Sequence, residues 1–132
     1  MSAHAQDTPD GLIGTLRHAI VALVRRDEPD LSARQLGVFL TCYLDPQPQT
    51  VRGLAAALDI SKPAVTRAVD RLAAFELVVR KPDPADRRSV LIARTPAGTA
   101  FLRELRTILR TAAAPKPAPR ARAAAIEARV AH

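Results

Sequence analysis

Residues 54–72 read LAAALDISKPAVTRAVDRL, and this segment sets the architecture expected for the whole chain. Its apolar residues recur at the spacing that packs two short helices together at a steep angle: Leu54, Leu58, Ile60, Val65 and Ala68. Ala55 supplies a small side chain where these helices would approach most closely. Asp59 falls in the turn, which requires a residue that tolerates a left-handed backbone; Gly is usual and Asp is a permitted second choice. The segment predicts a helix-turn-helix.

The second of these helices has two contrasting faces. Val65, Val69 and Leu72 recur at i, i+4 and i+7, so they face the core. The opposite face is short, polar and basic, and it consists of Pro63, Thr66, Arg67 and Asp70, with Lys62 and Arg71 at its flanks. Such a face suits base edges in a major groove, whereas the alternative is an ordinary helical pair with a solvated outer face.

Capping side chains mark the starts of four helices: Ser32, Thr50, Ser61 and Thr95. Ser32 is followed by Gln35, which completes a capping box, and Thr95 is followed by Pro96, which is preorganised for the first helical position. We expect these helices to end near residues 44, 58, 75 and 111. A broad apolar arc over residues 12–24 predicts an earlier helix that ends near residues 25–26.

Two short apolar runs, Leu77–Val79 and Val90–Ile92, are typical of strands, and residues 81–88 between them are rich in turn formers. The order helix, helix, helix, tight turn, helix, hairpin, helix predicts a winged helix-turn-helix, which is mainly α with a small β-hairpin wing and flanking dimerisation helices. We expect one domain over residues 11–114 with its DNA-binding core at 31–98. Residues 1–10 would be a flexible N-terminus, and residues 115–132 an Ala/Pro/Arg-rich tail with the propensity for a short helix.

The net charge of +7 is unevenly distributed. Residues 1–49 carry four basic and six acidic side chains, residues 50–94 nine and five, and residues 95–132 seven and two. This distribution favours a polyanionic partner, nucleic acid before a membrane, although a solvated basic surface is the alternative. The start shows no signal-peptide pattern and the apolar run Ala19–Val24 is too short to span a bilayer, so we expect a cytoplasmic protein without a membrane partner.

Residues 31–98 resemble the MarR family of bacterial transcriptional regulators. The resemblance rests on the helix start at 31–35, the helix-turn-helix at 54–72, and the motifs LVVR at 77–80, DPADRR at 83–88 and TPAG at 95–98. It implies a homodimeric winged helix that binds duplex DNA, with the recognition helix in the major groove and a wing arginine in the adjacent minor groove. The DNA-binding residues would be Ser61, Lys62, Pro63, Thr66, Arg67, Arg71, Arg87 and Arg88, with Asp86 supporting the wing.

Chemistry agrees with this role for the wing, because a narrow minor groove concentrates negative potential and a guanidinium keeps its charge there. Asp86 and Arg88 are two residues apart, so in an extended segment they share one side. We expect Asp86 to hold Arg88 as a local ion pair and Arg87 to be free for phosphate. The alternative is an exposed salt bridge of little value.

Three features depart from the family pattern. Glu76 stands where Gly usually precedes the first wing strand, Arg94 replaces an apolar residue, and the flanking segments are short. Leu12–Val24 and Phe101–Leu109 are nevertheless too apolar for isolated exposed helices, so we expect a homodimer.

An enzymatic function is disfavoured. His4, His18 and His132 are scattered without metal-ligand spacing, and the five glycines form no phosphate loop, so we expect no catalysis, metal or cofactor.

Some members of the MarR family sense oxidants with a cysteine. No cation adjoins Cys42 in its helix, so we expect Cys42 to be a small buried hydrophobic residue. The resemblance also implies room for a small-molecule effector between the dimer helices and the DNA-binding lobe.

Two functions remain after these exclusions. The first is a sequence-specific transcriptional regulator that binds an inverted repeat as a homodimer. The second is a winged helix used for protein interaction or for nonspecific, architectural DNA binding, with the basic tail supplying charge.

Overall fold

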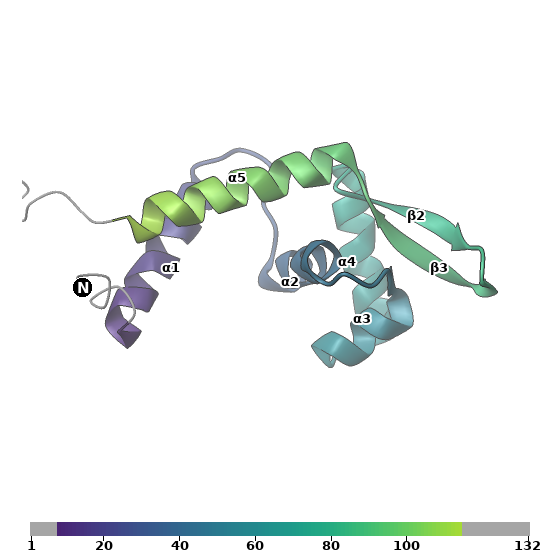
Figure 1. Ribbon diagram of the computed structural model, residues 1–132. Coiled ribbons are helices and arrows are strands. Elements are labelled where there is room, and N and C mark those ends of the chain that lie inside the picture. The colour runs from purple at the N-terminus through teal and green to yellow at the C-terminus, as the bar shows by residue number, and fades with distance from the viewer. Residues whose placement is uncertain (1–7, 115–132) are drawn as a thin grey trace, which may run out of the picture.

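The computed structural model describes residues 8–114, which form five helices and a three-stranded antiparallel sheet. The elements are α1 (Pro9–Val24), α2 (Ala33–Leu44), β1 (Gln49–Thr50), α3 (Val51–Leu58), α4 (Lys62–Ala74), β2 (Val78–Asp83), β3 (Asp86–Arg94) and α5 (Pro96–Ala113). The lobe formed by α2, α3, α4 and the sheet is joined by α5 to α1, which lies at the far end of the molecule (Figure 1). The winged helix-turn-helix architecture is confirmed.

Each helix begins at a side chain that accepts a hydrogen bond from a backbone N–H three residues further on. The four expected caps, Ser32, Thr50, Ser61 and Thr95, all do so, and Ser32 and Gln35 form the complete capping box. A fifth cap, Thr8, starts α1 at Pro9. Residues 9 and 10, expected in the N-terminal segment, therefore belong to the first helix, whereas the expected tail lies outside the described residues.

The core lies where α2, α3 and α4 meet. Its most deeply buried side chains are Val38, Phe39, Leu54, Val65, Val69 and Leu72. The Phe39 ring stacks on Tyr43 with centroids 4.4 Å apart and meets Phe101 edge-on at 5.2 Å, so α5 is packed onto the same core. The helical spacing of residues 54–72 thus predicted the correct inner face.

Two turns use a left-handed backbone at residues other than glycine. Asp59 ends α3 with φ of 53°, as its position in the sequence predicts. Glu76 follows α4 with φ of 61°, and the N–H groups of Glu76 and Leu77 donate to the carbonyls of Ala73 and Leu72, each at 2.9 Å. The turn is therefore kept although Glu replaces the usual Gly.

The wing is longer and its turn tighter than the sequence indicated. Pairing runs from Val78↔Arg94 outward to Asp83↔Asp86, so most of residues 81–88 are strand and only two residues separate β2 from β3. The unexpected strand β1 pairs with β3 at Gln49↔Ile92 and Thr50↔Leu91, which gives the order β1-β3-β2. The wing is thus anchored at its inner end by a third strand and projects from there as a two-stranded ribbon.

Side chains far apart in the chain join the root of the wing to α2. Tyr43 donates its hydroxyl to the Leu77 carbonyl at 2.6 Å and accepts from the Thr95 N–H at 2.9 Å. Arg94 donates from Nε to the Cys42 carbonyl at 3.1 Å and from Nη2 to the Asp45 carbonyl at 2.9 Å. Arg94, which departs from the family pattern, therefore binds carbonyls at the C-terminal end of α2.

Candidate nucleic-acid interface

The outer face of α4 is arranged as the sequence predicts. The expected contact residues at its start and along its outer side are exposed: Ser61, Lys62, Pro63, Thr66, Arg67 and Arg71. The opposite side of the helix is buried through Ala64, Val65, Ala68, Val69 and Leu72. Ser61 Oγ accepts from the Ala64 N–H at 3.2 Å, and within residues 8–114 its own O–H donates to no other group. The helix therefore presents hydrogen-bonding groups on a rigid support.

The two arginines of α4 differ in their surroundings. The Arg71 guanidinium carbon lies 4.7 Å from the centroid of the Phe75 ring, which holds this cation at the C-terminal end of the helix. Within residues 8–114, Arg67 makes no hydrogen bond or ion pair, and its side chain is exposed. The Arg67 guanidinium is thus unpaired among the described residues, whereas that of Arg71 is held against an aromatic ring.

Asp70 on the same face is not free, and its partner was missed in the sequence. Arg80 of β2 places Nη2 2.5 Å from Asp70 Oδ1 and 3.5 Å from the Thr66 carbonyl oxygen. Because alternate residues of a strand share a face, the apolar Val78 two positions earlier was the sequence signal that Arg80 lies on the inward face of the strand.

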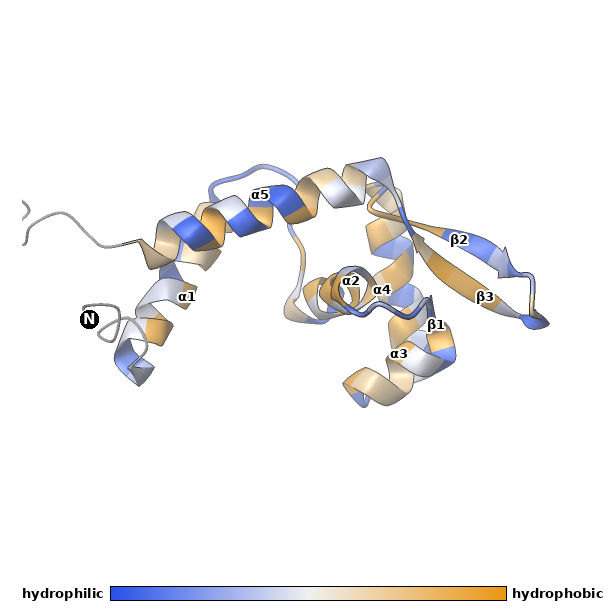
Figure 2. Ribbon diagram, in the orientation of Figure 1, coloured by the Kyte–Doolittle hydropathy of each residue, from blue (hydrophilic) through white to orange (hydrophobic). Residues whose placement is uncertain are grey.

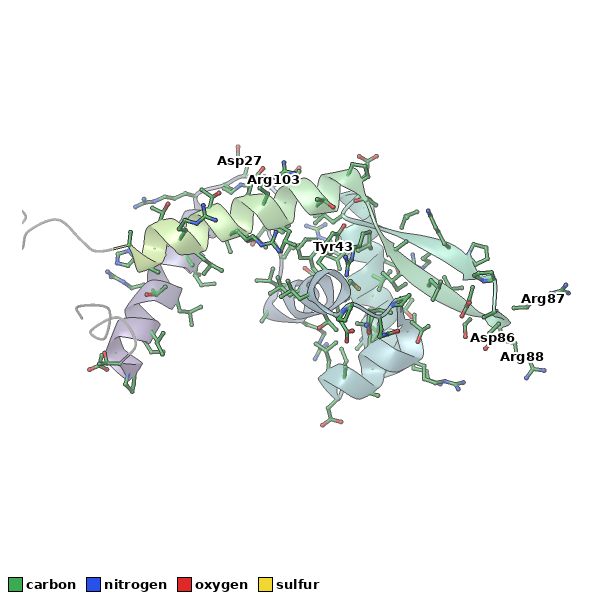
Figure 3. All side chains as sticks on the ribbon, viewed as in Figure 1. Asp27, Tyr43, Asp86, Arg87, Arg88 and Arg103 are labelled. Atoms are coloured by element: carbon green, nitrogen blue, oxygen red, sulfur yellow. The ribbon has the colours of Figure 1, made fainter. Side chains whose placement is uncertain are left out.

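The tip of the wing carries Asp86, Arg87 and Arg88, all exposed. Figure 3 shows both arginines projecting beyond the end of the hairpin, away from the helices. The ion pair expected between Asp86 and Arg88 is absent from residues 8–114, so that expectation was wrong. Asp86 instead accepts from the Arg88 N–H at 3.0 Å and from the Ser89 hydroxyl at 3.1 Å, because its short side chain reaches the adjacent backbone more readily than a distant guanidinium. Both guanidinium groups are left available.

A second feature lies at the opposite end of the molecule. Large apolar side chains are exposed along α1, including Ile13 (65%), Leu16 (53%) and Val24 (72%), and the apolar bands of α1 and α5 are visible in Figure 2. Between α1, α2 and α5 lies a cavity of about 480 Å³ lined by Leu16, Ile20, Leu23, Leu36, Leu40 and Phe101. Among the described residues, Asp30 is the one ionisable side chain that lines it.

Cys42 is buried, as expected, and burial raises the pKa of its thiol to about 11. Arg94 lies close enough to oppose that shift in pKa, which corrects the expectation that no cation is nearby. Arg94 is 52 residues away in the chain, so only folding brings the two together. The thiol is therefore protonated at neutral pH.

No group of three or more His, Cys, Asp or Glu side chains within residues 8–114 is positioned to hold a metal ion. No helix in the same range has the length and apolar character needed to cross a membrane.

The helix-turn-helix of α3 and α4, the hairpin beside it and the exposed arginines on both define a winged helix-turn-helix protein. Residues 29–89 match the MarR family. Over this segment the chain is similar to the MarR family.

One curated relative and two solved structures are similar to this chain. The transcriptional repressor NicR of Pseudomonas putida is 34% identical over 86 residues, which are 65% of this chain and 54% of NicR, so the chain spans about half the length of this curated relative. The structure of Rv1404 from Mycobacterium tuberculosis is similar with a TM-score of 0.64 and 30% identity over 76% of this chain and 65% of that chain. The Bordetella bronchiseptica protein BpsR, whose DNA binding is regulated by 6-hydroxynicotinic acid, matches with a TM-score of 0.54 and 25% identity over 92% of this chain and 90% of that one.

Proposed function

We propose that this protein is a cytoplasmic transcriptional regulator of the MarR type that binds duplex DNA sequence-specifically. The observation that carries the proposal is the pairing of an exposed polar and basic face on α4 with two exposed arginines at the tip of the wing. A helix of this kind suits the major groove, and guanidinium groups suit the narrow minor groove beside it. The names of NicR and BpsR, a repressor and a protein with regulated DNA binding, support the same function here.

The proposed DNA-binding form is a homodimer on an inverted repeat. The apolar side chains exposed on α1, together with Leu109 of α5 (49%), form a surface that a soluble monomer rarely leaves uncovered. A second copy would cover it by two-fold symmetry and place two α4 helices on successive turns of the same duplex face. The half-sites should then lie about 10 base pairs apart, centre to centre.

Regulation by a small molecule is part of the proposal. The cavity between α1, α2 and α5 has the size of a small-ligand site and an almost wholly apolar lining. It lies between the proposed dimer helices and the DNA-binding lobe, so a ligand there would change how the two lobes of a dimer are spaced. The effector that acts on BpsR supports regulation of this type.

Selection of duplexes from a random-sequence library, followed by affinity measurements at several salt concentrations, tests the function. We expect enrichment of an imperfect inverted repeat and, for about eight neutralised phosphates, a slope of log affinity against log salt near −7. Equal binding to selected and scrambled duplexes would instead support nonspecific, architectural binding. A slope near zero with no enrichment would support a protein-interaction module.

A further inference from the structure

We infer that Asp70 and Arg80 are positioning residues that set the wing against the recognition helix, so that both enter their grooves together. The inference rests on the proposed DNA-binding function and deepens it. Neither residue needs to touch a base for this role. The pair joins the two elements that carry the proposed contacts, α4 and β2.

The wing depends on this connection because little else supports it beyond its root. Val78 is buried in the core, but the rest of β2 is mostly exposed, as is the outer part of β3. The strand β1 pairs with β3 only as far out as Leu91. A two-stranded ribbon is marginally stable by itself, so the angle of the wing is set by whatever ties it to α4.

Arg80 provides that tie. Among the described residues of the wing beyond Val78, only Arg80 has a side chain that hydrogen-bonds to α4. Its Nη2 reaches the Asp70 carboxylate and the Thr66 carbonyl, which are one helical turn apart. These bonds fix the start of the wing beside the residues proposed to enter the major groove, Thr66 and Arg67.

The charge of Asp70 is otherwise unexpected on this surface. A carboxylate on a face that meets phosphates is repelled by them, so electrostatics alone predicts that its removal strengthens binding to any DNA. An ion pair exposed to this degree also contributes little to folding stability. Preorganisation of two groove contacts gives the carboxylate a reason to be present, because it lowers the entropy lost when both form.

Repulsion between Asp70 and the phosphates and positioning of the wing by Asp70 make opposite predictions for Asp70→Asn. If Asp70 positions the wing, Asp70→Asn should weaken binding to the selected duplex about five- to tenfold, although a negative charge is removed, whereas binding to a scrambled duplex should be unchanged or slightly stronger. Arg80→Lys should act in the same direction, because an ammonium keeps the charge but loses the guanidinium geometry. Glu76→Gln is the matched control, since Glu76 is an exposed acid just after α4 whose side chain makes no hydrogen bond or ion pair within residues 8–114.

Hydroxyl-radical footprinting of the same complexes provides a readout that a purely structural role would not change. With Asp70→Asn, protection by the wing in the minor groove should fade while protection by α4 in the major groove remains. Thermal melting checks that each variant is folded. The inference would be overturned if Asp70→Asn bound the selected duplex as tightly as the wild type or more tightly. Full retention of binding by Arg80→Lys would also overturn it. A wild-type chain with no preference for the selected duplex would overturn the proposed function itself.

Discussion

Gly98 of α5 lies directly against the hydroxyl of Tyr43 on α2. A Cβ atom at residue 98 would overlap both that hydroxyl and the Leu77 carbonyl oxygen to which it donates. The contact holds α5 against the root of the wing. Here glycine is required by close approach and not by its backbone angles, since no glycine between residues 8 and 114 has a positive φ.

Gly98→Ala should therefore destabilise the fold by about 3 kcal/mol, because the methyl group displaces the Tyr43 hydroxyl and breaks its buried hydrogen bonds. Denaturant unfolding monitored by circular dichroism measures the loss. Gly14→Ala is the control, since a Cβ there meets nothing within 4 Å, and it should be neutral or stabilising by up to about 1 kcal/mol. Equal stability of the two variants would contradict the close contact.

Tyr43→Phe should cost about 1–3 kcal/mol, because the Leu77 carbonyl loses its donor and the Thr95 N–H its acceptor. The same hydroxyl is the group that clashes with a Cβ at residue 98. In a Tyr43→Phe background Gly98→Ala should consequently cost less than in the wild type. A double-mutant cycle measures this coupling, and strictly additive effects would argue against it.

Glu76→Gly should stabilise the protein by about 0.5–1 kcal/mol, since glycine adopts a left-handed backbone without a Cβ penalty, partly offset by its greater freedom in the unfolded chain. The Glu76 carbonyl, which accepts from the Thr95 hydroxyl at 2.6 Å, is unaffected by the change. The denaturation midpoint should rise with an unchanged slope. A lower midpoint would mean that the Glu76 side chain contributes more than the strain it introduces.

Arg88→Ala should weaken DNA binding chiefly on duplexes with A·T-rich flanks, where the minor groove is narrow, and Arg88→Lys should recover only part of the loss. Asp86→Ala should act in the same direction but less, because it removes the hydrogen bonds that shape the backbone at Arg88 and leaves the guanidinium in place. Titration of duplexes that differ only in their flanks measures these effects. Uniform losses on every flank would place Arg88 on phosphates instead.

The stability of the fold should decline with alkaline pH in a way that depends on Cys42. Its thiol has a pKa of about 11 when folded, raised by burial from 9.0, so the folded state retains the proton between these values while the unfolded state releases it. The stability contribution of the thiol is present below pH 9 and should fall by about 2–3 kcal/mol as the pH rises to 11. Cys42→Ala should remove this part of the pH dependence, which unfolding curves of both proteins at pH 8 and 11 would reveal.

Much of the fold was readable from local patterns. The caps at Ser32, Thr50, Ser61 and Thr95, the left-handed turn at Asp59 and the buried face of α4 all depend on residues within about one helical turn of each other. Such interactions are specified by residue type and spacing alone. The same holds for the exposure of the candidate contact residues on α4, since burial of one helical face leaves the other in solvent.

The contacts that orient the two parts of the candidate site follow a different rule. Arg80 meets Asp70 across ten residues, Tyr43 meets Leu77 across 34, and Arg94 meets Cys42 across 52, so no local periodicity encodes them. The ion pair inferred between Asp86 and Arg88 failed because a nearby backbone N–H and a serine hydroxyl competed for the same carboxylate, which spacing alone does not reveal. Local hydrogen bonds and hydrophobic periodicity therefore specified which elements form. The partner of each charged side chain was determined only by packing of the assembled chain, because it depends on which groups folding brings within a few ångströms.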